Sequence, residues 1–228
     1  MDQPPLRRIS WRGAARLIPS RYPSVGLFDR VASADDLEAI VELESWTNDR
    51  VNVELGVLHT IPREEWVTGR SLASVVMAAF CHPHPRGARF SDAQRGAWYA
   101  SRPLETALAE SAFRRTQELQ EVGVLDARVQ MRLYLSDFRA TFHDIRGADP
   151  AFAPLYDPES YAASQEFARR LLAAGSHGVV YRSVRHRGGE CIACFRPKLV
   201  QNVRAAAHYE FRWTGTPTPE ISRLAAST

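Results

Sequence analysis

Apolar and polar positions alternate strictly over residues 128–135, and this is the clearest pattern along the chain. A repeat of two directs successive side chains to opposite faces, so this stretch predicts a strand in a sheet with one buried face. A second short strand is expected over residues 138–145. Two further apolar runs, at 178–181 and 191–195, flank a turn with two glycines and therefore predict a hairpin.

Two segments carry the signals of helices, and a third is ambiguous. Ser33, with an acidic residue three positions later, predicts a helix start, and the apolar spacing that follows ends before Asn48. Another helix opens at Asp157 and stops at Gly175, in the position that a left-handed C-cap requires. Residues 74–80 are almost entirely apolar, and their length does not distinguish a strand from a helix.

Residues 89–110 place an arginine, a tyrosine and a glutamate at nearly even spacing. A short β-type run places Tyr99 at a strand end. Pro103 suits the first turn of a helix that should continue to about Thr116, because this turn leaves its N–H groups unused. Glu110 then lies two turns into the helix, roughly a hundred degrees from the stripe of small residues that faces the sheet. A carboxylate in this position can border a cleft.

The composition favours one compact domain. Of the 228 residues 45% are hydrophobic, and no long polar break divides them. We expect an α/β (α+β) domain with a central mixed or antiparallel sheet over residues 31–213. Residues 1–30 are rich in arginine and proline and predict an irregular arm lying on the core. Residues 214–228 lack a sustained apolar pattern and predict a tail that is mobile or used for interaction.

The charge pattern indicates which partners to expect. A net charge of +3 arises almost wholly from arginine, since Lys198 is the only lysine, and acidic residues are nearly as numerous as basic ones. This is a mild bias toward anionic ligands and not the clustered basic charge of a nucleic-acid binder. No apolar run approaches the roughly 20 residues that span a bilayer, and the first residues lack the core of a signal peptide. We expect a cytoplasmic protein without membrane contact.

Three cysteines, an odd number, fit a reducing compartment better than a disulfide scaffold. Cys191 and Cys194 have the C-x-x-C spacing, and Cys81 with its neighbouring histidines is conceivable as the other half of a zinc site. Residues three apart on a strand point to opposite faces, however, so the two thiols cannot easily reach one metal. We interpret both as buried structural cysteines and expect no metal.

The sequence contains no G-x-S-x-G, H-E-x-x-H or G-x-G-x-x-G pattern. Composition and periodicity alone therefore predict an α/β or α+β domain and no particular function. In the order and spacing of residues 89–90, 98–110 and 178–189, the chain resembles the RES-domain family over roughly residues 20–213. These proteins are the toxin half of bacterial RES–Xre toxin–antitoxin pairs, named for an arginine, a glutamate and a serine. Two segments support the likeness, 143–146 and 155–158.

The resemblance implies a fold similar to ADP-ribosyltransferase toxins and an enzyme that destroys NAD, its substrate and not a cofactor. The name residues map onto Arg89, Glu110 and Ser183, and Tyr99 matches the family's aromatic site residue. Glu110 would stabilise the positive charge that develops as nicotinamide leaves the ribose. Arg89 would hold the diphosphate or the adjoining ribose, and Tyr99 would stack on the nicotinamide ring. Ser183 would orient a ribose or amide group. Two nearby arginines are further candidates for phosphate binding, Arg182 and Arg185.

The residues leave the acceptor of the ADP-ribose open. Water would give hydrolysis, inorganic phosphate would give phosphorolysis, and a macromolecule would make the protein an ADP-ribosyltransferase with the same donor site. A non-catalytic module that binds nucleic acid through its arginines is the alternative from another class.

The resemblance also implies a partner, a small Xre-like helix-turn-helix antitoxin that covers the cleft. Whether the toxin forms a homodimer within that complex stays open.

Overall fold

The computed structural model describes residues 4–20, 27–44, 55–147 and 149–225, and within these ranges one mixed sheet of seven strands forms the centre. The strands are β1 (Leu6–Pro19), β2 (Trp98–Arg102), β3 (Asp126–Asp144), β4 (Gly178–Arg182), β5 (Glu190–Cys194), β6 (Gln201–Thr214) and β7 (Glu220–Arg223). Their order is β1-β2-β5-β4-β3-β6-β7, and β1 also pairs with β3, so five strands close a ring. Only the pairing of β3 with β4 is parallel among the described strand pairs. The predicted α/β domain with a central mixed sheet is confirmed.

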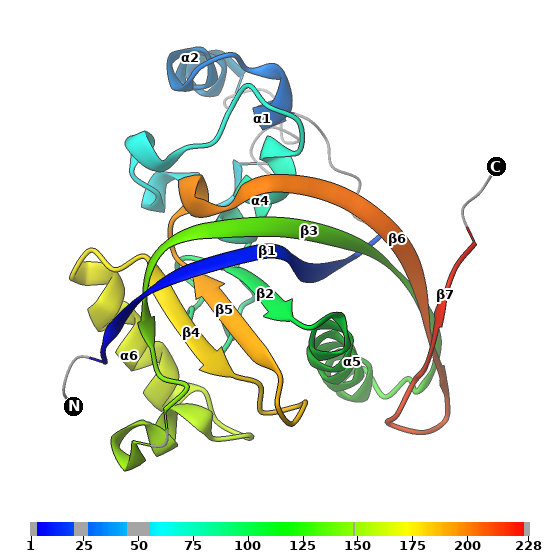
Figure 1. The fold of residues 1–228 in the computed structure, drawn as a ribbon. Helices are drawn as coiled ribbons and strands as arrows, with labels where there is room; N and C mark the ends of the chain where they lie inside the picture. Colours follow the sequence, from blue (N-terminus) through cyan, green and yellow to red (C-terminus); the bar gives the residue numbers. More distant parts are fainter. Residues whose placement is uncertain (1–3, 21–26, 45–54, 148, 226–228) are drawn as a thin grey trace.

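Helices cover both sides of this curved sheet (Figure 1). They are α1 (Leu27–Arg30), α2 (Ala34–Glu44), α4 (Ala73–Cys81), α5 (Leu104–Glu121) and α6 (Ala162–Ala173), with short 3₁₀ turns η1 (Leu58–Thr60), η2 (Arg63–Glu65), η3 (Pro150–Tyr156) and η4 (Pro197–Leu199). In Figure 1, α1 and α2 lie above the arched strands β1, β3 and β6, α4 lies partly behind them, and α5 and α6 lie below them. Among the described helices, none has the length and apolar content to cross a bilayer.

The core divides into three apolar clusters that follow these layers. One joins α1 and α4 to the sheet, and a second joins α6 and η3 to β4 and β5. The third joins α5 to β1, β3 and β6. Each helix therefore buries one side against strands, as amphipathic helices do.

Both ends of the chain contribute strands, which corrects the prediction of an irregular N-terminal arm. Strand β1 pairs antiparallel with β3 along its length and buries Ile9 and Trp11. A bulge between Trp11 and Ala14 shifts the register. That shift, together with the arginines between the apolar positions, interrupts the alternation that would have indicated a strand. Within the predicted tail, β7 pairs with β6.

Most other predicted elements are confirmed, with different bounds. The alternating stretch and the run that follows it form one continuous strand, β3. The ambiguous residues 74–80 belong to helix α4. Ser33 precedes α2, and its hydroxyl accepts from a backbone N–H in the first turn, whereas the stop predicted before Asn48 lies outside the described residues. Gly175 follows α6 with a φ of +80°, as predicted for a left-handed cap.

Replacing Trp11 with alanine tests whether β1 is part of the core. Trp11 is 5% exposed, so Trp11→Ala should lower the free energy of unfolding by about 3–5 kcal/mol. Arg12→Ala, at the exposed neighbouring position, is the control and should change it by less than about 0.5 kcal/mol. Chemical denaturation followed by circular dichroism measures both variants. Small, equal effects would mean that this segment lies on the surface after all.

Candidate functional site

Two of the four residues predicted for the site, Glu110 and Ser183, are in contact where the β4–β5 turn reaches α5, at the lower side of Figure 1. The other two lie at the loop before β2, where the Tyr99 hydroxyl contacts the residue that follows Arg89. Arg89 lies in the loop between α4 and β2, and Tyr99 is the second residue of β2. Glu110 lies in the second turn of α5, and Ser183 follows the last residue of β4. Because β2 pairs with β5 and β5 pairs with β4, these elements are neighbours in the sheet.

Ser183 and Glu110 are in direct contact. The hydroxyl of Ser183 donates to Oε1 of Glu110 at 2.6 Å, a length typical of a hydrogen bond to a carboxylate. The same Oγ accepts from the backbone N–H groups of Arg185, at 3.1 Å, and His186, at 2.9 Å. Since its donor and acceptor capacities are both used, the serine side chain has one fixed orientation. Ser183 therefore fastens the turn after β4 to the carboxylate on α5.

The turn that carries Ser183 lies close against α5. Oγ1 of the buried Thr106 lies 2.8 Å from Nδ1 of His186. A Cβ atom on Gly189 would lie 2.3 Å from Thr106 Oγ1, so a glycine is needed for this close approach. This contact was not predicted from the sequence, because the histidine pairs with a threonine on a distant element and no spacing motif indicates such a pair.

Arg89 is held in place by the segment that leads into α6. Its Nη1 donates to the carbonyl of Leu155 at 2.9 Å and to that of Asp157 at 2.8 Å. Its guanidinium carbon lies 4.8 Å from the centroid of the Tyr161 ring, and the residue is only 8% exposed. Arg89 is therefore not a solvated loop residue. It ties the loop before β2 to residues 155–161.

Tyr99 joins β2 to the loop of Arg89. Its hydroxyl accepts from the backbone N–H of Phe90 and donates to Oγ of Ser91, both at 3.0 Å. Burial raises the pKa of Tyr99 to about 12, so the phenol is neutral at physiological pH. Arg16 on β1 donates to the Tyr99 carbonyl at 3.1 Å. Because residue 16 was assigned to an irregular arm, sequence analysis did not connect it with this site.

The charges of Arg89 and Glu110 both affect the pKa values of two buried groups, Cys191 and Tyr181. Burial and, to a smaller extent, the negative charge of Glu110 raise the pKa of the Cys191 thiol to about 12, whereas the positive charge of Arg89 lowers it. Burial likewise raises the pKa of Tyr181 well above its usual value, with added contributions from Cys191 and Glu110 and opposition from Arg89. Both charges therefore influence the same two side chains, and of these Cys191 has its Sγ 4.0 Å from Oε1 of Glu110.

The two cysteines of β5 face opposite sides of the sheet. Cys191 packs in the cluster with α6, and Cys194 packs in the cluster with α4. Both are buried and free, as is Cys81. The prediction of two buried structural cysteines on a strand is confirmed. Over the described part of the chain, no three His, Cys, Asp or Glu side chains gather in a way that could hold a metal ion.

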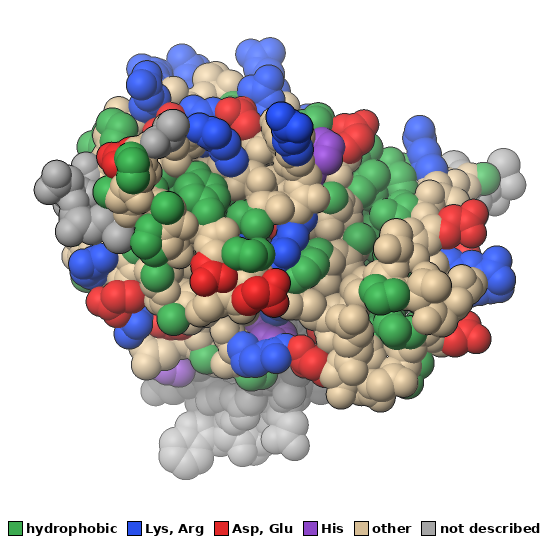
Figure 2. Space-filling model, turned by 90° about the horizontal axis from the view of Figure 1, so that it is seen from below, with side chains coloured by type: hydrophobic (Ala, Val, Ile, Leu, Met, Phe, Trp, Pro, Cys, Tyr) green, Lys and Arg blue, Asp and Glu red, His purple; other side chains and the backbone are tan. Residues whose placement is uncertain are grey.

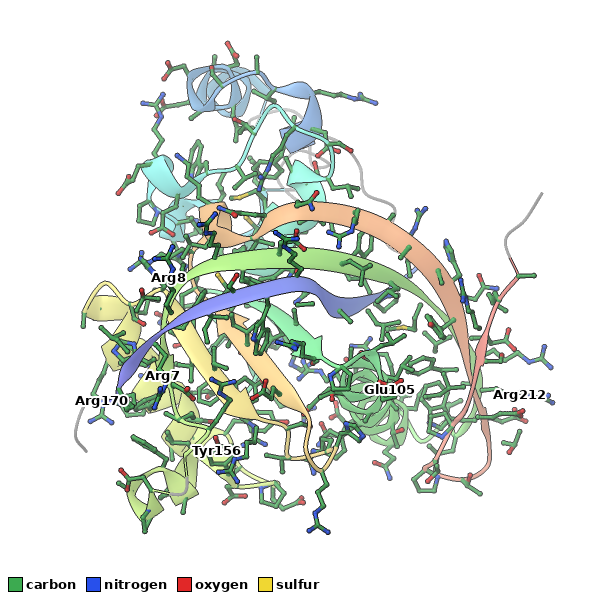
Figure 3. All side chains as sticks on the ribbon, in the orientation of Figure 1. Arg7, Arg8, Glu105, Tyr156, Arg170 and Arg212 are labelled. Carbon is green, nitrogen blue, oxygen red and sulfur yellow. The ribbon has the colours of Figure 1, made fainter. Side chains whose placement is uncertain are left out.

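Polar contacts connect β4 to the residues that follow β3. Figure 2 looks at the molecule from the side on which the β4–β5 turn lies, and acidic and basic side chains there are interspersed with hydrophobic ones. Tyr156, labelled in Figure 3 beside the lower part of β4, donates to the carbonyl of Ile145 at 2.6 Å and accepts from the N–H of Arg182 at 3.3 Å. The Arg182 side chain donates to the carbonyl of Arg146. Arg182 is thus engaged with the loop after β3.

A cavity of about 290 Å³ opens between residues 90–96 and α6. Phe90 and Ser91 line it, and both also contact the Tyr99 hydroxyl. Its lining does not include Glu110 or Ser183. This cavity is therefore adjacent to the site without containing the carboxylate.

These observations define a class of protein. It is a mixed α/β domain in which a serine binds a half-buried carboxylate at one end of the sheet. Residues 58–214 match the RES domain. The uncharacterized protein y4oC of Sinorhizobium fredii is 30% identical over 203 residues, which cover 88% of this chain and 83% of that protein. The chain belongs to the RES-domain family. It is also similar to a chain in the crystal structure of the M. tuberculosis MbcT–MbcA toxin–antitoxin complex, with a TM-score of 0.45, 9% identity and coverage of 89% of this chain and 86% of that one.

Thiol reactivity tests the burial of the site. Burial raises the pKa of Cys81, Cys191 and Cys194 to about 12 each, so only about one thiol in ten thousand is ionised at pH 8. The folded protein should show no rapidly reacting thiol with Ellman's reagent at pH 8, and reaction should accelerate as the pH rises toward 12. All three thiols should react after denaturation in guanidinium chloride. Rapid modification of Cys191 in the folded protein would contradict its burial beside Glu110.

Proposed function

We propose that this protein is a toxin of a toxin–antitoxin system that cleaves the nicotinamide–ribose bond of NAD. The observation that carries the proposal is the hydrogen bond between Ser183 and Glu110, which joins two of the three residues of the family name in one half-buried site. Arg89, the third, influences the same buried groups as Glu110. Membership of the RES-domain family supports the toxin class.

The chemistry requires little more than a positioned carboxylate. Nicotinamide leaves as a neutral molecule from a cationic ring, so no acid has to protonate it, and positive charge develops on the ribose as the bond breaks. The carboxylate of Glu110 stabilises this charge and accepts from the ribose hydroxyls, as the second carboxylate does in glycosidases. Ser183 donates to Oε1 and fixes the carboxylate before substrate arrives. We assign Oε2 to the substrate.

Arg89 and Tyr99 have supporting roles in this proposal. Arg89 contributes positive charge beside the ribose that adjoins the diphosphate, and it fixes residues 155–157 through two carbonyl contacts. Tyr99 offers a neutral aromatic face to the positively charged nicotinamide ring, a favourable pairing of cation and π system. Its hydroxyl is held by Phe90 and Ser91, which sets the orientation of the ring.

Product analysis tests this proposal directly. Purified protein is incubated with NAD, with and without inorganic phosphate, and the products are identified by mass. We expect release of nicotinamide together with ADP-ribose, or with ADP-ribose phosphate if phosphate is the acceptor. Stoichiometric transfer of labelled ADP-ribose to a protein would favour the transferase alternative, because the acceptor is independent of the donor site. No loss of NAD with folded, antitoxin-free protein would refute the proposal.

Glu110→Gln tests the central residue. The amide keeps the shape and an acceptor for Ser183 but removes the negative charge, so NAD turnover should fall by about a hundredfold to a thousandfold. The matched control is Glu105→Gln on the same helix, whose exposed side chain is labelled in Figure 3 and should be dispensable for turnover. Thermal unfolding of both variants checks that they fold. Near wild-type turnover of Glu110→Gln would exclude this residue as the charge-stabilising group.

We also propose a small helix-turn-helix antitoxin as the partner, encoded beside this protein and covering the site. Expression of the wild type alone should arrest bacterial growth, co-expression of the antitoxin should restore it, and Glu110→Gln should be tolerated. Colony counts and intracellular NAD levels measure these outcomes. Harmless accumulation of the folded wild-type protein in cells that lack the antitoxin would count against a toxin.

A further inference from the structure

Arg185 spans the space between α5 and the segment before α6. It lies two residues after Ser183, and its guanidinium carbon is 3.3 Å from the centroid of the Phe113 ring. Its Nη2 donates to the carbonyl of Pro158. Phe113 lies three residues after Glu110 on α5, on the same side of the helix. The side chain of Arg185 therefore lies against α5 one turn beyond the proposed catalytic carboxylate, and it connects α5 to the segment before α6, which form two walls around this space.

Arg89 and Arg185 bind successive carbonyl groups of one segment. Arg89 donates to Asp157, and Arg185 donates to Pro158. The two arginines differ in how firmly they are held: Arg89 is 8% exposed and its Nη1 contacts two carbonyls, whereas Arg185 is partly exposed. The contacts of Arg185, a neutral carbonyl and an aromatic face near solvent, are the kind that an anionic ligand can replace.

We propose that Arg185 is the residue that binds the diphosphate of the dinucleotide, and that in the free protein it acts as a strap that bridges Phe113 and Pro158. This inference rests on the proposed function and assigns to Arg185 the diphosphate contact that the family resemblance gave to Arg89. Phosphate oxygens accept two charge-assisted hydrogen bonds from a guanidinium, which a backbone carbonyl cannot. Substrate binding thus exchanges the Pro158 contact for a stronger one and opens the site between the two walls.

Neighbouring arginines provide the comparison. The Arg182 side chain donates to the carbonyl of Arg146 in the loop after β3, and its backbone N–H donates to the Tyr156 hydroxyl. Arg187 lies in the same turn as Arg185 and is exposed. Arg187 therefore matches Arg185 in charge and in position along the chain, and it is the control for a non-specific effect of removing one positive charge.

Titration calorimetry with ADP and with adenosine tests the strap without any turnover. All proteins carry Glu110→Gln, so that growth arrest does not limit their yield. Arg185→Ala should weaken ADP binding by about tenfold to a hundredfold, the loss expected for a charge-assisted contact, and should leave adenosine binding unchanged. Arg185→Lys should restore part of the affinity, because it keeps the charge and loses the planar fork. Arg187→Ala should bind ADP like the parent protein.

Three results would overturn the inference. They are unchanged ADP affinity in Arg185→Ala, equal loss of ADP and adenosine affinity in that variant, and an equal loss of ADP affinity in Arg187→Ala. Failure of the parent protein to bind ADP would also overturn it. This test is separate from the test of the proposed function. If the protein binds ADP through Arg185 but does not cleave NAD, the role of Arg185 stands and the proposed reaction is refuted.

Discussion

The hydrogen bond from Ser183 to Glu110 is the interaction on which the site depends. It joins the turn after β4 to the second turn of α5, two elements 73 residues apart in the chain. Two backbone N–H groups bind the same serine oxygen, so the bond fixes the turn as well as the carboxylate. A short carboxylate contact within a partly buried site is stronger than one in water, because the local dielectric is lower. The loss of this bond would free the carboxylate of Glu110 and leave the Thr106–His186 contact to hold the turn against α5.

The remaining residues form a frame around this pair. Tyr181 and Cys191 are buried next to this pair, and the charges of Glu110 and Arg89 affect the pKa values of their side chains. Beside it, Arg89 and Arg185 fix two successive carbonyls of the segment before α6. In the proposed function, this frame combines one carboxylate for the developing positive charge with Arg185 for the diphosphate and Arg89 for the adjoining ribose. Such preorganised charges suit a reaction in which a cationic group leaves a dinucleotide.

Local patterns predicted much of the fold from the sequence. The alternation at 128–135 and the hairpin around Gly188 and Gly189 each depend on neighbouring residues, and both are confirmed. A helix begins after Pro103, which is its N-cap and not part of the first turn as predicted. Strand β1 could not be predicted in this way, because its bulge and its arginines interrupt the period of two and its pairing partner β3 lies more than a hundred residues away. The resemblance supplied Arg89, Tyr99, Glu110 and Ser183 as candidates. Their neighbours Arg16, Phe113 and Tyr181 are brought in by tertiary contacts, which leave no spacing signal in the sequence.

The crystal structure of the Glu110→Gln variant with NAD tests the central claim most directly. The account predicts that the nicotinamide ribose lies against residue 110 and Ser183, with the nicotinamide ring on Tyr99 and the diphosphate on the arginine side of the site. The substrate hydroxyls should contact the side chain at position 110 that Ser183 orients. The account would be contradicted if NAD bound elsewhere, for example in the cavity beside α6, and did not contact residue 110 or Ser183.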